Sequence, residues 1–325
     1  AIDSASNLIK DYPENSILHN ITGACYAGLG NQISAVRCYK KAIEISPGYA
    51  KAHNNLGSIY FEMEQFEDSI ESYGCSLEAD PDNAEIHYYL ANSLKQNGLS
   101  DLAIKSYKKA LEIAPSFIEA LYGLGILYYD VGKLDEALSY FHKVIEIKPN
   151  LAEVHNKAGE SFEGLGDFDN AIKSFKQAIN LNPSFSEAHN NLGNAFKAIG
   201  HLDDAIKSYK KALDINPEYP ALYNNLGNSY KALGNLKDAV KSYLEGLTLN
   251  PGYIDILNNL GLIYNELGEM NNAVDSFQKA IAIKPDYAEA FNNLGVTYNK
   301  FDQLEKAVHA FESALKINPN FPSPY

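Results

Sequence analysis

Arginine is nearly absent from this chain of 325 residues, and basic charge is scarce overall. Arg37 is the one arginine, and 41 acidic residues against 27 basic ones give a net charge of −14 at pH 7. A nucleic-acid-binding protein presents a basic surface rich in guanidinium groups to the phosphate backbone. The composition therefore predicts that the chain binds no nucleic acid.

Cysteine is also scarce, with Cys25, Cys38 and Cys75 as the only three. An odd number without a C-x-x-C spacing argues against a disulfide framework and against a zinc site. We therefore expect no metal and no cofactor, and a reducing compartment, the cytoplasm. Histidine does not change this expectation. His19, His53, His87, His155 and His189 recur at a spacing that suits a packing position in a repeat better than a shared metal.

Long apolar runs and catalytic motifs are missing as well. No run approaches the roughly 18 apolar residues that a membrane span needs, and residues 1–4 show neither the basic nor the apolar part of a signal peptide. The sequence contains no G-x-S-x-G, no P-loop and no dinucleotide-binding glycine motif. We predict no membrane insertion and no enzyme activity within this chain.

Proline, in contrast, recurs with a strict period. Ten of the thirteen prolines follow one another at intervals of 34 residues, at Pro13, Pro47, Pro81, Pro115, Pro149, Pro183, Pro217, Pro251, Pro285 and Pro319. A fixed period of this length is the signature of a solenoid of repeated helical hairpins.

Each 34-residue window, counted from the third residue after a proline, contains the pattern of two helices. In the window that opens at Ser186, apolar residues at helical spacing predict a first helix from Ser186 to Ile199, which Gly200 ends. A second helix is predicted from about Leu202 to Ile215, before Pro217. The eighth and twentieth places are small and the twenty-fourth is aromatic in every complete window, so the two helices are expected to pack closely, with the aromatic rings between neighbouring windows.

These residues resemble the tetratricopeptide repeat family. One full instance of its pattern is Leu192-Gly193, Phe196, Gly200, Ala205, Tyr209, Ala212 and Pro217. The resemblance covers essentially the whole chain and implies an all-α, right-handed superhelical solenoid. Glu64 and Asp302 depart from the pattern, because they replace the glycine of the turn.

The resemblance also predicts the organisation of the chain. Residues 1–15 match the second helix of a truncated repeat, residues 16–321 match nine complete repeats, and residues 322–325 match the start of a truncated tenth repeat. Because the chain lacks an initiator methionine and a polar capping helix, we expect the native chain to continue in both directions.

Asparagine pairs at the fifth and sixth places of the windows give the best functional signal. Helix interiors do not favour asparagine, so its recurrence suggests a use other than local stability. In the family, the first helix of each repeat lines the concave face. The candidate peptide-binding residues are Asn55, Asn190, Asn191, Asn194, Lys197, Asn224, Asn225, Asn228, Lys231, Asn258, Asn259, Asn265, Asn292, Asn293 and Asn299.

An asparagine row can bind the main chain of an extended segment, because each amide offers one acceptor and two donors. The predicted function is therefore a protein-interaction module that binds peptide segments in its concave groove, weakly and with broad specificity. The alternative without a binding function is that recent duplication copied the asparagines without selection for binding. Another charged feature, the nine acidic residues without a basic one from Glu62 to Glu85, could dock a basic partner, but such a run is more often a solvated face.

The asparagine row also resembles the repeats of protein O-linked N-acetylglucosamine transferases and SPINDLY-like proteins. That resemblance implies an alternative function, the substrate-recruiting arm of a larger glycosyltransferase, in which Asn191, Asn225, Asn259 and Asn293 hold the substrate peptide. A third possibility is a scaffold that associates end to end with copies of itself. The sequence does not identify the ligand, the flanking domains or the oligomeric state.

Overall fold

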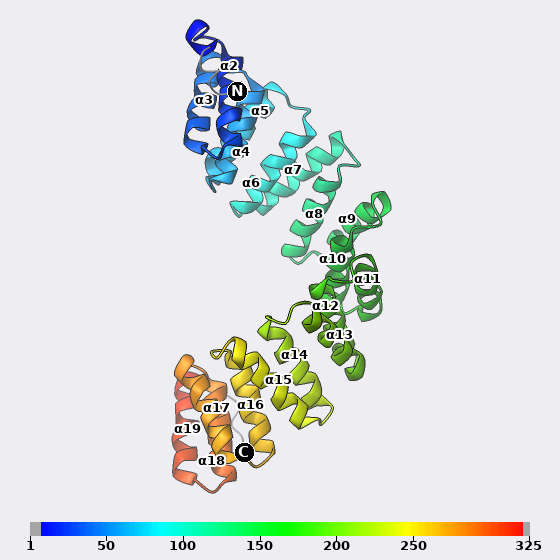
Figure 1. Cartoon of the computed structure of the whole chain (residues 1–325), viewed down its shortest axis with the longest axis vertical. Helices are drawn as coiled ribbons and strands as arrows, with labels where there is room; N and C mark the ends of the chain where they lie inside the picture. Colours follow the sequence, from blue (N-terminus) through cyan, green and yellow to red (C-terminus); the bar gives the residue numbers. More distant parts are fainter. Residues whose placement is uncertain (1–7, 321–325) are drawn as a thin grey trace. The chain divides into compact units, whose positions relative to one another are not determined.

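The structure, a computed structural model that describes residues 8–320, consists of α-helices joined by short turns in that range (Figure 1). The chain divides into two compact units, residues 1–161 and residues 162–325. The first unit contains α2 (Ser16–Gly28), α3 (Gln32–Ile45), α4 (Ala50–Glu62), α5 (Phe66–Ala79), α6 (Ala84–Gln96), α7 (Ser100–Ile113), α8 (Ile118–Asp130) and α9 (Leu134–Ile147).

One helix, α10 (Ala152–Gly164), begins in the first unit and ends in the second. The second unit continues with α11 (Phe168–Leu181), α12 (Ser186–Ala198), α13 (Leu202–Ile215), α14 (Pro220–Ala232), α15 (Leu236–Leu249), α16 (Ile254–Glu266), α17 (Met270–Ile283), α18 (Ala288–Lys300) and α19 (Leu304–Ile317). The predicted all-α solenoid of helical hairpins is confirmed. Its right-handed superhelical course stays a prediction.

The predicted helix ends are confirmed within one residue in the window that opens at Ser186. The first helix there, α12, ends at Ala198, and Ile199 follows as its C-cap. Of the predicted truncated repeat at residues 1–15, residues 8–11 are helical and residues 1–7 lie outside the described range. The predicted start of a tenth repeat at residues 322–325 also lies outside it.

The turn inside each hairpin needs a residue with positive φ. Glycine provides it at φ between 73° and 80° in seven hairpins, at Gly30, Gly98, Gly132, Gly166, Gly200, Gly234 and Gly268. Glu64 and Asp302 adopt the same conformation at φ 58° and 59°. A side chain with a Cβ is strained there, by about 1 kcal/mol, so these two turns are the strained ones among the described hairpins.

Packing within a hairpin depends on a glycine that faces an aromatic ring. A Cβ added to Gly193 would lie 2.6 Å from Cε1 of Tyr209, closer than two carbons can approach. Tyr209 is fully buried and packs against Leu222 and Leu226 of the next hairpin. Each such ring therefore fixes the distance between the two helices of its own hairpin and closes the core against the following one, as the sequence predicts.

The first helices of neighbouring hairpins approach each other more closely than the second helices do. In the first unit α2 contacts α4, α4 contacts α6, and α6 contacts α8, and in the second unit α12 contacts α14, α14 contacts α16, and α16 contacts α18. Among the described helices of each unit, second helices of adjacent hairpins make no such contact. The side of each unit formed by these first helices, called the inner face below, is therefore its concave side.

Candidate functional site

Asparagine side chains of neighbouring first helices are hydrogen-bonded to one another along the inner face. In each contact a sixth-place asparagine donates through Nδ2 to Oδ1 of the fifth-place asparagine in the preceding hairpin. The distances are 2.9 Å from Asn55 to Asn20, 3.1 Å from Asn225 to Asn190, 3.1 Å from Asn259 to Asn224 and 3.0 Å from Asn293 to Asn258. The amides therefore hold successive hairpins in register, a structural role in addition to any binding.

The carbonyl oxygens of three sixth-place amides stay available in the second unit. Among the described residues, the buried side-chain oxygens or nitrogens without a partner are Oδ1 of Asn54 and of Asn265. The Oδ1 atoms of Asn225, Asn259 and Asn293 make no hydrogen bond to described residues and are not among these buried atoms. They therefore reach solvent and form a row of acceptors on the inner face.

The donors of the row are used more fully than its acceptors. Asn259 donates to Asn224 and, at 3.2 Å, to Oδ1 of Asn228. Asn258, which is 4% exposed, donates to Oε1 of Glu289 on the next first helix at 3.2 Å. Asn259 thus donates two hydrogen bonds, whereas Asn225 and Asn293 each donate one to a described residue.

Two of the predicted binding residues instead satisfy buried tyrosines. The hydroxyl of Tyr209 donates to Oδ1 of Asn194 at 2.8 Å, and the hydroxyl of Tyr243 donates to Oδ1 of Asn228 at 2.7 Å. Burial raises the pKa of both phenols well above the usual range, so both remain neutral donors. The carbonyl oxygens of Asn194 and Asn228 are consequently occupied within their own hairpins.

The remaining predicted residues of the second unit lie on the same first helices without joining the amide row. Lys197 and Lys231 are half-buried in the last turns of α12 and α14. Asn265 has its buried Oδ1 unpartnered, while its main-chain oxygen accepts from Nζ of Lys300. Asn299 is exposed, and Asn292 makes no side-chain hydrogen bond to described residues.

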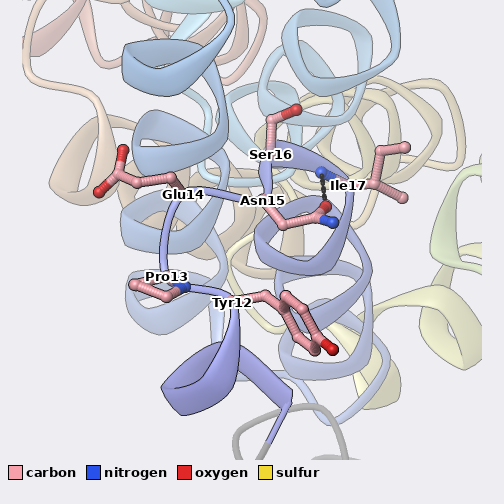
Figure 2. Close-up of a pocket in the computed structure, with 6 residues that line it drawn as sticks. All are labelled: Tyr12, Pro13, Glu14, Asn15, Ser16 and Ile17. Carbon is pink, nitrogen blue, oxygen red and sulfur yellow. Dashed lines mark hydrogen bonds between the residues drawn. The ribbon is translucent and has the colours of Figure 1, made fainter.

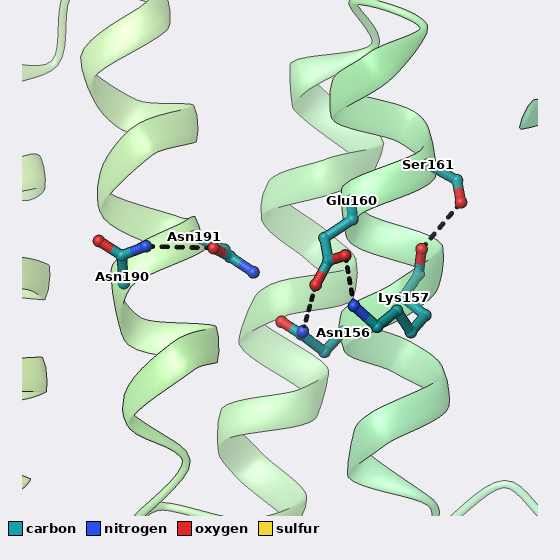
Figure 3. Close-up of polar contacts among 6 residues, drawn as sticks. All are labelled: Asn156, Lys157, Glu160, Ser161, Asn190 and Asn191. Carbon is teal, nitrogen blue, oxygen red and sulfur yellow. Dashed lines mark hydrogen bonds and ion pairs between the residues drawn. The ribbon is translucent and has the colours of Figure 1, made fainter. Parts of the chain in front are cut away.

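Figure 3 shows two further sets of polar contacts, one on α10 and one on α12. On α10, Asn156 and Lys157 both donate to the carboxylate of Glu160, each at 2.7 Å. On α12, Asn190 donates to Oδ1 of its neighbour Asn191 at 3.3 Å. The charge of Lys157, the one basic residue among the sixth places, is therefore balanced within its own helix.

The five recurring histidines have a structural role. Nε2 of each ring lies within hydrogen-bond distance of the carbonyl oxygen of the proline six residues earlier, at 2.8–3.1 Å, in His19, His53, His87, His155 and His189. Since the carbonyl only accepts, Nε2 carries the proton and donates. No group of histidines, cysteines and carboxylates among the described residues could hold a metal ion.

A hollow of about 490 Å³ lies beside the turn that precedes α2, lined by six consecutive residues from Tyr12 to Ile17 (Figure 2). Asn15 in this turn caps α2 by accepting from the amide nitrogens of Ile17 and Leu18 at 3.0 and 3.2 Å. The amide oxygen of Asn15 is therefore already used by the helix end. We assign no binding role to this hollow.

The tyrosine partners of Asn194 and Asn228 were missed by the sequence analysis, although the sequence contains a signal for them. A tyrosine at the twenty-fourth place faces Ser or Asn at the ninth place in four hairpins, with Ser58–Tyr73, Asn92–Tyr107, Asn194–Tyr209 and Asn228–Tyr243 as the pairs. Where the aromatic is phenylalanine, the ninth place is apolar at Ile126, Leu262 and Val296. Glu160 with Phe175 and Ala24 with Tyr39 depart from this rule.

No helix among the described residues is long and apolar enough to span a membrane. The cytoplasmic location stays a prediction.

Sequence profiles of one family match most of the chain. A profile described as "TPR repeat" matches residues 26–64, 57–98, 101–132, 164–200, 193–234, 227–268 and 261–300. A profile described as "Tetratricopeptide repeat" matches residues 118–151 and 288–321. No curated protein was found to match the chain.

Solved structures of the same type resemble parts of the chain. YrrB, described as "a TPR protein with an unusual peptide-binding site", has a TM-score of 0.53 at 24% identity over 58% of this chain and 97% of its own. A crystal structure of MamA has a TM-score of 0.48 at 30% identity over 50% of this chain and 94% of its own. A second MamA structure has a TM-score of 0.49 at 27% identity, covering 54% and 97%. The likeness to YrrB shows a shared fold.

Proposed function

The chain belongs to the tetratricopeptide repeat family, and from this premise we propose that the inner face of its second unit binds the main chain of an extended protein segment. Repeats of this family fill essentially the whole chain, and they act in protein interaction rather than in catalysis. The chain is thus a protein-interaction module.

The row of acceptors formed by Asn225, Asn259 and Asn293 is the observation that supports this function. Each amide is fixed by an inter-hairpin hydrogen bond and turns its Oδ1 toward solvent. An extended chain presents a main-chain N–H donor about every 3.3 Å. Neighbouring first helices lie roughly 10 Å apart, so successive acceptors would meet about every third residue of the segment.

Fixed amides favour binding because little side-chain freedom is lost when the segment arrives. Each hydrogen bond contributes about 0.5–1.5 kcal/mol net, so three of them supply a few kcal/mol. The expected affinity is micromolar, with broad specificity, because main-chain N–H groups are common to nearly all sequences. YrrB, a protein of the same fold described as having an unusual peptide-binding site, supports a peptide as the class of ligand.

Two sets of alanine substitutions separate binding from stability. Replacing Asn225, Asn259 and Asn293 removes the three asparagine–asparagine bonds of the row, the bond from Asn259 to Asn228 and the three acceptors. The matched control replaces Asn190, Asn224 and Asn258, which removes the same three asparagine–asparagine bonds and the bond from Asn258 to Glu289. It keeps the three acceptors, although their amides are then no longer fixed by those bonds.

Binding is measured by fluorescence anisotropy with a peptide selected from an array of short, unstructured sequences. We expect the sixth-place set to raise Kd at least about tenfold, which corresponds to about 1.4 kcal/mol, and the fifth-place set to raise it much less. The same peptide with N-methylated main-chain amides should bind weakly to the unaltered protein. Equal Kd values for the two sets, or tight binding of the N-methylated peptide, would refute the proposal.

The two other functions considered from the sequence, a recruiting arm of a glycosyltransferase and an end-to-end scaffold, are supported by no contact of the described residues. They stay predictions.

A further inference from the structure

The inner face of the first unit replaces the asparagine pair by tyrosines on α6. Tyr88 and Tyr89 occupy the fifth and sixth places there. The ring of Tyr89 is stacked on the buried ring of Tyr73 at a centroid distance of 5.9 Å and an interplanar angle of 19°. Tyr88 lies beside it at 5.3 Å, tilted by 57°. Tyr89 remains 39% exposed, so part of its aromatic surface is open to a ligand.

This tyrosine leaves a hydrogen bond unmade between α4 and α6. In the preceding pair of hairpins of the same unit, Asn55 donates to Asn20 at 2.9 Å. The next fifth-place residue, Asn54, has a buried Oδ1 without any partner, and the sixth place that would supply its donor is Tyr89. A buried acceptor without a donor destabilises a fold. Hydrogen bonding between hairpins therefore does not explain why Tyr89 stands where asparagine would fit, and what this residue adds is an aromatic ring stacked on Tyr73.

Carboxylates lie beside the exposed ring. Glu85 is one helical turn before Tyr89 on α6, so both side chains project from one face. Glu119 is the second-place residue of α8, and its equivalent in the second unit, Glu289, accepts from the fifth-place Asn258 of the preceding hairpin at 3.2 Å. Both carboxylates are exposed. The pKa of Tyr89 is raised, first by burial and also by the charges of Glu85 and Glu119, which agrees with this placement.

Two lysines on first helices near α6 in the sequence, one on α6 itself and one on α10, are already paired. Nζ of Lys95 lies 2.7 Å from Oδ2 of Asp130, and Nζ of Lys157 lies 2.7 Å from Oε2 of Glu160. The surface around Tyr89 therefore combines an open aromatic ring with two carboxylates, Glu85 and Glu119, that form no ion pair with a described residue. An aromatic face attracts a cation through its quadrupole, and carboxylates strengthen that attraction.

We propose that Tyr89, Glu85 and Glu119 form a subsite on the first unit that takes the cationic side chain, arginine before lysine, of a bound protein segment. The subsite rests on the proposed function, because it assumes a peptide ligand, and it adds the charge class of that ligand. Arginine is favoured because its planar guanidinium stacks on an aromatic ring while it donates to a carboxylate. The net charge of −14 attracts such a basic segment from a distance.

The test compares a fluorescein-labelled glycine–serine peptide that contains several arginines with the same peptide containing citrulline, which keeps the shape and removes the charge. Anisotropy should show at least about fivefold tighter binding of the arginine peptide at low salt, the factor that about 1 kcal/mol represents. The preference should shrink as salt is added.

Three variants locate the subsite. Tyr89→Asn removes the ring and introduces the amide that Asn54 lacks, so it should lose the arginine preference without losing stability. Glu85→Gln should reduce the preference while leaving the ring in place. Glu67→Gln, in the first turn of the second helix α5, changes the net charge by the same amount and should leave the preference unchanged.

Circular dichroism and the unfolding midpoint report whether each variant folds, and Tyr89→Leu provides a second removal of the ring. Equal binding of the arginine and citrulline peptides to the unaltered protein, or no binding of either, overturns the subsite. A preference that survives Tyr89→Asn or Tyr89→Leu overturns it as well. The Asn225, Asn259 and Asn293 set tests the second unit separately, so a failure of the acceptor row and a failure of the subsite are distinguished.

Discussion

Tyr209 and Asn194 show how one hydrogen bond sets the residue types at two places of a hairpin. The phenol is fully buried, so its O–H needs an acceptor, and Asn194 supplies one at 2.8 Å. At the equivalent places the next-but-one hairpin has Phe277 and Leu262, and Phe277 is also fully buried. The same space is thus filled by either a polar pair or an apolar pair.

We expect the substitutions Asn194→Leu and Tyr209→Phe to be strongly coupled. Asn194→Leu alone leaves a buried hydroxyl without an acceptor and should cost about 1–3 kcal/mol of unfolding free energy. Adding Tyr209→Phe should recover most of that loss, because the double variant reproduces the Leu262–Phe277 pair. Urea denaturation followed by circular dichroism measures all four proteins of the cycle.

Additive effects in this cycle would show that the hydrogen bond contributes little. The control is the reverse exchange at Leu262 and Phe277, to asparagine and tyrosine. That double variant should also fold with little loss of stability.

For single residues, the sequence identified the unusual asparagine positions but did not identify the hydrogen-bond partners of their side chains. The recurrence of asparagine marked Asn225 and Asn259 as unusual. Their acceptors lie 35 residues earlier, and that contact exists only because adjacent first helices approach each other. A single window of sequence does not contain that geometry, so the inter-hairpin role of the amides became visible only in the structure.

Among the turns of the described residues, the one between α4 and α5 is one of two that hold a positive φ without glycine. Glu64 adopts φ 58° where seven other hairpins have glycine. We expect Glu64→Gly to raise the unfolding free energy by about 1 kcal/mol, because glycine removes the steric strain of the left-handed conformation. The same exchange at Asp302, with φ 59°, should have a similar effect.

The matched control is Gly200→Ala, at a turn with φ 80°. It should lower the unfolding free energy by about 1 kcal/mol, since alanine is strained there. If Glu64→Gly proved destabilising, the greater freedom of glycine in the unfolded chain would outweigh the strain at this turn.

Element boundaries could be predicted well, because they depend on local chemistry. Gly200 and Pro217 end their helices through backbone constraints that act within a few residues. The predicted second helix from Leu202 to Ile215 coincides with α13. The division of the chain at residue 161, in contrast, follows no break in the 34-residue period and was not predicted.

The excess of acidic charge affects the stability of the whole molecule. The 41 acidic residues outnumber the 27 basic ones by 14. Many ion pairs are exposed contacts within one helix, such as Lys207 with Asp204 at 3.1 Å, and such pairs contribute little. Repulsion between like charges therefore dominates, and we expect the thermal unfolding midpoint to rise when sodium chloride is increased to about 0.15 M, where the screening length falls to about 8 Å.

Chloride is the suitable salt for this measurement, because sulfate would also strengthen apolar burial. A midpoint that falls with added chloride would mean that attractive pairs outweigh the net repulsion. In that case the variant Asp204→Asn, which breaks one exposed pair, should lower the midpoint at low salt.

The hydrogen bond between asparagine side chains of adjacent hairpins has a direction. The sixth-place asparagine donates it, and the fifth-place asparagine of the preceding hairpin accepts it. A hairpin with asparagine at both places, such as the one that begins with α14, can therefore follow any hairpin of its own kind and precede another. Duplicating or deleting this hairpin would keep every donor of the row matched to an acceptor. The hairpin that begins with α6 is not interchangeable in this way, because Tyr88 and Tyr89 neither accept nor donate the asparagine hydrogen bond. A copy of this hairpin would interrupt the asparagine row wherever it was inserted.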